Sequence, residues 1–409
     1  MIKLLSSDEI QDHLWTVLSA GLSAVYATLL ILMTTRFVSL TVAGILSYAA
    51  AVSELLRILV MFGVRGYQST DMKQEFNFNV YLGLRTLTAL LASIVLAVFL
   101  ILGRFEPFRA AVMLLFFFTY LTDMYADVFM GDLQQKGKMR IAGRMRATGF
   151  ASALIAFAIA SFTTQTLLLP LAFAGFAICC VNIVWIWVYR SHFGAIRVKI
   201  DVIAIKKLAV STYPIAISSL LFIYLYHAQK YYLGAFGLDE AVAIITILML
   251  PAMLLNLFCI FFFMGAELTY MAGLFTSGQL RRFAIRVNQQ LLIVVALCIP
   301  FMIFIYFSGI FLLSWLYGVD LSVYKEQLML LSSGSVFLAI VSVLNAVLIV
   351  MRRQKTTMFC MMAVACVTGP AMWFLVSRYG LTGAAFSNLV IFVPMAVLLY
   401  VVYRVALKI

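Results

Sequence analysis

Charged residues inside long apolar runs are the part of this sequence with the clearest potential for chemistry. Glu54 and Arg57 are three residues apart, so on a helix they share one face and can pair. Asp123 and Asp127 are four apart and share a face with Tyr120, an arrangement of like charges that favours proton or cation binding. A charge near the bilayer centre costs roughly 2.5–3.5 kcal/mol, so such residues normally face a protein interior or an aqueous cavity.

A second charged group lies among tyrosines in the second half of the chain. His227 and Lys230 are three apart, with Tyr224 and Tyr231 close by in sequence. This pattern indicates either a cationic, aromatic cavity wall suited to phosphate and sugar rings, or an interfacial belt anchored by a lysine. Arg36, near the end of the first apolar run, has the same two explanations.

Each intramembrane charge in the first half also has a purely structural explanation. Glu54 and Arg57 can neutralise each other, and the two aspartates can pair with basic residues at the membrane edge, such as Arg140 or Arg144. Arg85 lies near the start of its apolar run and is expected to snorkel toward water. Taken together, the basic side chains from both halves favour a cavity that accepts anions.

The composition indicates that membrane-spanning helices carry these residues. The chain has 409 residues, of which 65% are hydrophobic and 11% are charged. Soluble domains have about 45–50% apolar and about 25% charged residues, and a spanning helix takes roughly 20 apolar residues. We therefore predict an all-α, polytopic membrane protein without a sizeable soluble catalytic domain. The predicted spans are 12–34, 41–63, 80–103, 108–130, 146–163, 168–189, 207–232, 240–264, 287–313, 327–351, 357–377 and 381–404.

The distribution of basic residues predicts the orientation of these spans. With the amino terminus inside, 21 Lys and Arg lie at the cytoplasmic ends and connections and six at the outer side. Cytoplasmic loops collect Lys and Arg, so both termini are expected in the cytoplasm, and the net charge of +13 requires no nucleic-acid partner. The first run is too long for a signal peptide and is expected to be an uncleaved span.

The six cysteines indicate neither a metal site nor a disulfide framework. All six lie in apolar runs and none forms a CxxC pair. No cofactor is therefore expected.

The basic connection 190–207 predicts a joint between two lobes, 1–195 and 196–409, each a six-helix bundle. Because six is even, both lobes enter the membrane from the same side and are related by a pseudo-two-fold axis along the membrane normal. Five prolines lie within predicted spans, namely Pro214, Pro251, Pro300, Pro370 and Pro394. They are either static kinks or bends that let the second lobe rock.

An ordered set of short motifs runs along nearly the whole chain. The set comprises Thr34-Thr-Arg36, Gly44-Ile-Leu-Ser-Tyr48, Phe62-Gly63, Tyr213-Pro214, Lys230-Tyr-Tyr-Leu-Gly234, Phe236-Gly237, Trp315-Leu-Tyr-Gly318, Arg352-Arg-Gln-Lys355 and Tyr379-Gly-Leu-Thr-Gly-Ala-Ala385. This set resembles the polysaccharide transporters of the O-antigen flippase type, within the multidrug/oligosaccharidyl-lipid/polysaccharide (MOP) exporter superfamily. Many of these relatives carry an acidic residue immediately before the basic residue of span seven, where this chain has Gln229.

The resemblance implies an alternating-access flippase in a bacterial inner membrane, and not an enzyme. Its substrate would be an undecaprenyl-diphosphate-linked oligosaccharide, such as an O-antigen repeat unit of lipopolysaccharide or a capsule or exopolysaccharide unit. The polysaccharide polymerase and chain-length machinery are expected partners beside the lipid bilayer.

The resemblance and the charges together lead us to predict three groups of site residues. These are Arg36, Arg57 and Lys230 for the diphosphate, Tyr224, His227 and Tyr231 for the sugars and cavity wall, and Glu54, Asp123 and Asp127 for ion coupling.

Two other classes of function compete with this interpretation. A cation-coupled multidrug exporter of the same superfamily would show one dominant buried carboxylate and an apolar pocket. A membrane-embedded glycan polymerase or acyltransferase would need a large extramembrane loop or a placed set of His, Asp or Glu, whereas the outer loops here are short. The basic bias of the candidate cavity favours the flippase.

Overall fold

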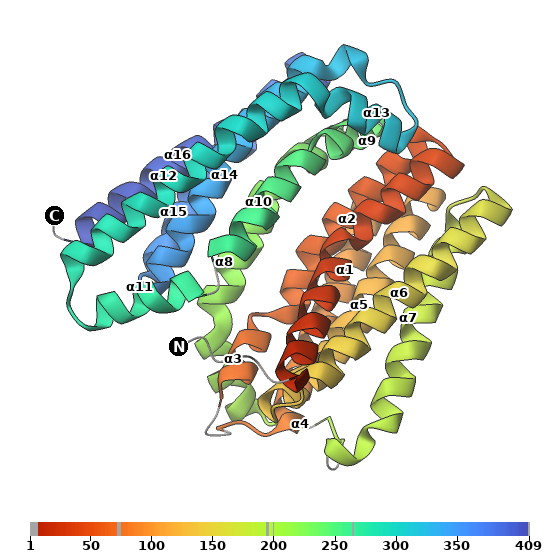
Figure 1. The fold of residues 1–409 in the computed structure, drawn as a ribbon. Coiled ribbons are helices and arrows are strands. Elements are labelled where there is room, and N and C mark those ends of the chain that lie inside the picture. The colour runs from red at the N-terminus through yellow and green to blue at the C-terminus, as the bar shows by residue number, and fades with distance from the viewer. Residues whose placement is uncertain (1–6, 72–74, 194–195, 199, 264–265, 408–409) are drawn as a thin grey trace. The chain divides into compact units, whose positions relative to one another are not determined.

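The computed structural model describes residues 7–71, 75–193, 196–198, 200–263 and 266–407. Throughout these residues the chain is helical and forms no strand (Figure 1). Twelve helices of the described chain are long and apolar enough to cross a membrane, which confirms the predicted all-α, twelve-span fold. Four of the lysines behind the predicted orientation, Lys3, Lys73, Lys199 and Lys408, lie outside the described residues.

The chain divides into two compact units, residues 1–220 and 221–409. The boundary falls inside one helix, α8 (Val202–Ala235). The predicted lobes, 1–195 and 196–409, divide the chain before this helix rather than within it, and that division stays a prediction.

Unit 1 contains seven complete α-helices, a short 3-10 turn (Arg190–His192) and the first part of α8. The helices are α1 (Ser7–Phe37), α2 (Leu40–Met61), α3 (Val64–Thr70), α4 (Phe78–Gly103), α5 (Pro107–Gln135), α6 (Met139–Thr164) and α7 (Leu168–Val188).

Local sequence explains where several of these helices begin and end. The Ser39 hydroxyl accepts a hydrogen bond from the Val42 amide at the start of α2, and the Asn77 side-chain oxygen accepts one from the Val80 amide at the start of α4. Pro107, whose missing N–H is not needed at a helix start, opens α5. Phe62 and Gly63 adopt left-handed backbone angles, with φ of 46° and 67°, and separate α2 from α3.

Unit 2 continues with α8 and contains the remaining helices. They are α9 (Asp239–Leu248), α10 (Leu250–Phe263), α11 (Ala266–Thr276), α12 (Leu280–Phe304), a π-turn (Ile305–Gly309), α13 (Ile310–Tyr317), a 3-10 turn (Ser322–Tyr324), α14 (Lys325–Val350), α15 (Gln354–Ala385) and α16 (Ser387–Ala406).

Several spans are interrupted near prolines and glycines. The break between α9 and α10 is at Met249, two residues before Pro251, and the π-turn after α12 begins five residues after Pro300. Pro214, in contrast, lies within α8. The predicted eleventh span ends at residue 377, but α15 continues to Ala385 through a kink at Gly380, whose φ is 52°. Glycine tolerates that angle without the strain of a side chain.

Candidate functional site

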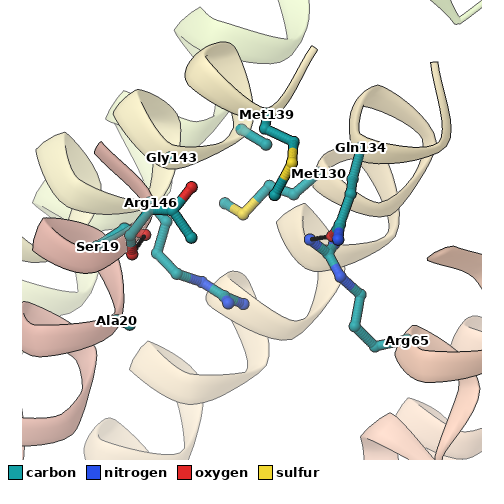
Figure 2. Close-up of a pocket in the computed structure, with 10 residues that line it drawn as sticks. Ser19, Ala20, Arg65, Met130, Gln134, Met139, Gly143 and Arg146 are labelled. Carbon is teal, nitrogen blue, oxygen red and sulfur yellow. Dashed lines mark hydrogen bonds between the residues drawn. The ribbon is translucent and has the colours of Figure 1, made fainter. Parts of the chain in front are cut away.

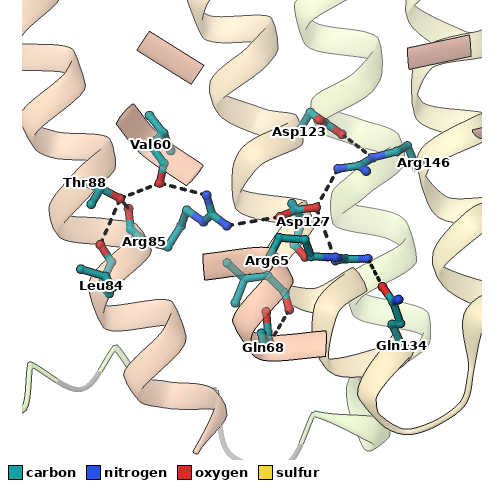
Figure 3. Close-up of polar contacts among 11 residues, drawn as sticks. Val60, Arg65, Gln68, Leu84, Arg85, Thr88, Asp123, Asp127, Gln134 and Arg146 are labelled. Atoms are coloured by element: carbon teal, nitrogen blue, oxygen red, sulfur yellow. Dashed lines mark hydrogen bonds and ion pairs between the residues drawn. The ribbon is translucent and has the colours of Figure 1, made fainter. Parts of the chain in front are cut away.

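The most charged region inside a span lies in unit 1 and is centred on Asp127 of α5. The carboxylate of Asp127 has no exposed surface and is surrounded by three arginines (Figure 3). Its oxygens lie 2.7 Å from Arg146 Nη2, 3.2 Å from Arg85 Nη2 and 3.3 Å from Arg65 Nη1. Arg65 also donates to the backbone carbonyl of Asp127 at 2.6 Å. One carboxylate therefore organises three guanidinium groups.

These residues meet because the helices that carry them have their ends on the same side of unit 1. Arg85 is seven residues after the start of α4, Arg146 is seven after the start of α6, and Asp127 is eight before the end of α5. At 1.5 Å per residue each lies about 10–12 Å from its helix end. Arg65 belongs to the short helix α3, which follows directly after α2. Arg85, Asp127 and Arg146 therefore lie well inside their helices, whereas Arg65 lies three residues before the end of the span Leu40–Gln68.

Arg85 does not snorkel to water, so that prediction is wrong. Its side chain is 0% exposed, and besides Asp127 it contacts the carbonyl oxygen of Val60, to which Nη1 donates at 2.9 Å. The left-handed turn that ends α2 takes this carbonyl out of the regular helical pattern, and the Thr88 hydroxyl donates to it as well. Arg85 is thus held by a carboxylate and a helix-end carbonyl.

Asp123 lies one turn before Asp127 and pairs with the same arginine, Arg146, at 3.4 Å. The two aspartates do pair with basic residues, but not with the ones the sequence suggested. Arg140 pairs with Asp12, and Arg144 lies over the ring of Trp15. Among the described residues, the Oδ2 atom of Asp123 is buried without a hydrogen-bond partner.

Glu54 and Arg57 form the ion pair that their spacing predicts, with 3.2 Å between Arg57 Nε and Glu54 Oε2. The Arg57 guanidinium also lies 5.7 Å from the centre of the Tyr120 ring. Both charged side chains keep about a quarter of their surface exposed, so this pair is more accessible than Asp127.

Arg36 is not close to Arg57. Arg36 is exposed in the last turn of α1, next to the start of α2, whereas Arg57 is 17 residues into α2. The helix rise places them about 25 Å apart along the axis. One diphosphate cannot contact both arginines at once in this structure, so any role of Arg36 is at a separate position.

A pocket of about 160 Å³ lies beside the arginine cluster (Figure 2). Arg146 reaches it from α6 and Arg65 from α3. The remaining lining residues are neutral, namely Thr16, Ser19, Ala20, Met130, Gln134, Met139, Ala142 and Gly143.

Arg65 and Arg146 were not among the site residues predicted from the sequence. Both were counted among the charges of the cytoplasmic span ends and connections, because the predicted second span ends at residue 63 and the predicted fifth span begins at Arg146 itself. In the structure the spans extend further, over Leu40–Gln68 and Met139–Thr164. A usable signal was Asp127 itself, since a buried carboxylate requires nearby cations.

In unit 2, α8 brings the predicted aromatic residues into one stack. The rings of Tyr224 and Tyr231 are parallel with centres 6.1 Å apart, and His227 packs edge-on against Tyr231. The Tyr224 hydroxyl lies 3.0 Å from that of Tyr232. Lys230 is only 7% exposed, so it lies inside the protein and does not act as an interfacial anchor.

The loop end of unit 2 holds one further strong ion pair. Glu267, in the first turn of α11, accepts hydrogen bonds from both Nε and Nη2 of Arg286 in α12. These contacts hold the pKa of Glu267 below its usual range. Tyr270 of α11 lies under the same guanidinium, so the contact fixes α11 to α12.

No protein-family model and no curated protein matches the chain. Solved structures with the same fold do exist. A multidrug resistance MATE family transporter of the MOP superfamily, in an inward-facing conformation, has a TM-score of 0.74 at 10% identity, over 96% of this chain and 98% of that one. The lipid II flippase MurJ, inward closed, has a TM-score of 0.69 at 14% identity, over 96% and 87%.

A MOP superfamily transporter from Pyrococcus furiosus, described as having a binding pocket of reverse polarity, also matches. Its TM-score is 0.60 at 13% identity, over 98% of this chain and 96% of that one. The chain therefore has the fold of the MOP superfamily transporters and is a multi-pass membrane protein.

Proposed function

We propose that this chain is an alternating-access flippase that moves an undecaprenyl-diphosphate-linked oligosaccharide from the cytoplasmic to the outer leaflet of a bacterial inner membrane. The observation that carries the proposal is the charge balance in unit 1. Three arginines, Arg65, Arg85 and Arg146, surround two carboxylates, so the cluster keeps one positive charge inside the membrane spans. Such an excess suits an anionic substrate.

Proteins with this fold transport different classes of substrate, and one of these classes supports the proposal. Solved proteins with this fold include a lipid II flippase as well as multidrug transporters. The transporter with a pocket of reverse polarity is described as suggesting a different function, which supports pocket charge as a guide to substrate class.

The proposed substrate needs a protein to cross the membrane at a useful rate. A diphosphate-sugar head loses its hydration when it crosses hydrocarbon, which makes spontaneous flipping slow. A polar path through protein removes this barrier while the prenyl tail stays in lipid. With about two negative charges, the head gains roughly 4–5 kcal/mol on moving outward across about 100 mV, inside negative. Membrane potential alone can therefore bias export.

We assign Arg57 and Lys230 to contacts with the diphosphate, and the stacked tyrosines of α8 to the sugars. Aromatic rings bury large areas and offer flat faces, which suits sugar rings. Arg36, at the end of α1, is assigned to a different stage of the passage.

One specific observation favours a second candidate, a cation-coupled multidrug exporter. The Oδ2 atom of Asp123 is buried and lacks a hydrogen-bond partner among the described residues, which leaves one carboxylate oxygen open to a proton or cation. Against this candidate, each of the carboxylates Glu54, Asp123 and Asp127 already pairs with an arginine.

The test uses a strain that lacks the gene for this chain and is complemented with variants. Arg57→Ala or Lys230→Ala should abolish surface polysaccharide while the protein remains at normal abundance in the membrane. The double variant Glu54→Ala/Arg57→Ala removes the whole ion pair and so leaves no uncompensated carboxylate. Export restored by the double variant would show that Arg57 only neutralises Glu54. Normal polymer in both single variants would reject the assignment of the anion site.

A further inference from the structure

The pocket of unit 1 has a marked charge asymmetry. Of the ten described residues that line it, Arg65 and Arg146 are the two charged ones, and they approach from different helices (Figure 2). Their side chains are 22% and 21% exposed, whereas the side chains of Asp127 and Asp123 are 0% and 2% exposed. A molecule entering the pocket therefore meets guanidinium groups, with the carboxylates behind them.

Both arginines retain hydrogen-bond donors for such a molecule. An arginine has five N–H donors. Hydrogen bonds from Arg65 to described residues go to the Asp127 carbonyl and to Gln134 Oε1, and the one from Arg146 goes to Asp127 Oδ1. Arg146 Nε is buried and lies 3.4 Å from Asp123 Oδ1, so the donors of Arg146 that remain for a ligand are on its two Nη atoms.

The remaining polar groups of the pocket add a further donor. Gln134 accepts from Arg65 through Oε1 at 2.8 Å, which leaves its NH₂ group to donate. The hydroxyl hydrogens of Thr16 and Ser19 already bond to backbone carbonyls of α1, so these two side chains offer only acceptor oxygens. The arginines and Gln134 are thus the donor side of the pocket.

The size of the pocket limits what it can hold. Its volume of about 160 Å³ is below the roughly 300–1,000 Å³ of sites for drug-sized ligands. It accommodates a compact anionic group rather than a sugar chain or a hydrophobic drug. The apolar wall formed by Met130, Met139 and Ala142 offers no competing charge.

We propose that this pocket binds a phosphate or diphosphate group, with Arg65 and Arg146 as the ligands and Asp127 and Asp123 as the residues that position them. Paired guanidinium forks match phosphate oxygens in geometry and charge. The group comes either from the head of an anionic lipid or from free phosphate. This inference deepens the proposed function by adding a phosphate-binding position to the path.

The test is a binding measurement on the full chain. Detergent-solubilised protein is titrated with inorganic diphosphate, and protein in nanodiscs is titrated with farnesyl diphosphate or compared with and without phosphatidylglycerol. We expect saturable binding, weakened by at least about tenfold in Arg65→Gln and in Arg146→Gln, because each loses charged hydrogen bonds. Arg140→Gln is the matched control, because Arg140 is on α6 but outside the pocket, and it should stay within about twofold of wild type.

Comparing the two titrations distinguishes a lipid head from free phosphate as the source of the bound group. Tighter binding of farnesyl diphosphate, or a requirement for phosphatidylglycerol, assigns the pocket to a lipid head, whereas equal binding of inorganic diphosphate assigns it to free phosphate. Ala20→Leu fills the pocket from α1 without removing a charge, so it should also weaken binding. This variant keeps the test decisive if an arginine variant does not fold. Wild-type affinity in Ala20→Leu and in the folded arginine variants would overturn the proposal, as would failure of every probe to bind.

Export measurements in the complemented strain keep the two proposals distinguishable. Diphosphate binding at the pocket, with surface polymer unaffected by loss of the chain, would reject the flippase function and leave the pocket assignment intact. Loss of polymer without the chain, together with wild-type binding and export in the pocket variants, would reject the pocket and leave the function.

Discussion

Arg85 and Asp127 form an ion pair, 3.2 Å between Nη2 and Oδ2, in which both side chains are completely buried in unit 1. Two ions taken out of water are stable only when each is paired and hydrogen-bonded. The Val60 carbonyl is a second hydrogen-bond partner of Arg85, and Arg65 and Arg146 also pair with Asp127.

The first prediction concerns the stability of this buried pair. Arg85→Met should lower the free energy of unfolding by about 3–5 kcal/mol, because it leaves a buried carboxylate with less counter-charge. Arg140→Met is the control, since Arg140 pairs with Asp12 at a site where the two side chains are 34% and 35% exposed, and should cost about 0–1 kcal/mol. Unfolding titrations in mixed micelles measure both values. Equal costs for the two variants would contradict the structural role assigned to Arg85.

The second prediction concerns close packing of α3 on α5. A Cβ atom at Gly131 would overlap the side chain of Gln68, whose Nε2 donates to the Val128 carbonyl. Gly131→Val should therefore destabilise unit 1 by about 1–3 kcal/mol. At Gly66, an exposed position of α3, a Cβ meets nothing within 4 Å, and Gly66→Ala should be neutral or slightly stabilising. Thermal unfolding distinguishes these outcomes, and tolerance of Gly131→Val would count against the packing.

The third prediction separates stacking from hydrogen bonding at the tyrosines of α8. If Tyr231 contacts sugars through its ring, Tyr231→Phe should export polymer normally and Tyr231→Ala should not, with equal protein abundance. Tyr379→Ala is the control, because Tyr379 is 60% exposed and lies in α15. Export assays with surface-polymer staining provide the readout. Normal export in Tyr231→Ala would remove this residue from the path.

The fourth prediction distinguishes the two candidate transport classes at Asp123. A flippase driven by membrane potential does not require proton uptake at this carboxylate, and asparagine keeps a side-chain oxygen that can face Arg146, so Asp123→Asn should still export polymer. A cation-coupled drug exporter would lose resistance in the same variant. Parallel measurements of surface polymer and drug sensitivity decide between them, and loss of resistance with no effect on polymer would favour the exporter.

The fifth prediction is a pH dependence at the contact between α11 and α12. Arg286 lowers the pKa of Glu267 in the folded protein, so the stabilising contact is complete above the usual Glu range and is lost as pH falls through the lowered value. Wild-type protein should therefore lose thermal stability between neutral and acidic pH more steeply than Glu267→Gln. Identical pH profiles would show that the pair adds no stability.

The twelve spans were predictable because each is a long apolar run, and the pairing of Glu54 with Arg57 was predictable because it depends only on spacing within one helix. The partners of Asp127 come from α3, α4 and α6, and which helix ends meet is decided by packing that no local pattern reveals. Hydropathy ended the second predicted span before Arg65 and made Arg146 the first residue of the fifth, so both were counted as charges at the cytoplasmic edge, although the spans of the structure extend past them.

Arg85 shows a second limit of sequence reasoning. A long basic side chain near a helix start has two ways to avoid hydrocarbon, namely reaching water or finding a buried partner, and sequence spacing does not distinguish them. The distant carboxylate of Asp127, 42 residues away in sequence, decided the outcome.

The most direct test of the central claim follows lipid movement in proteoliposomes that contain only this protein. A fluorescent, short-chain prenyl diphosphate oligosaccharide and a cationic dye are supplied in parallel under an imposed membrane potential. The account predicts that the anionic lipid crosses the bilayer, faster when the side it leaves is negative, and that Arg57→Ala stops it. Transport of the cationic dye, with no movement of the anionic lipid, would contradict it.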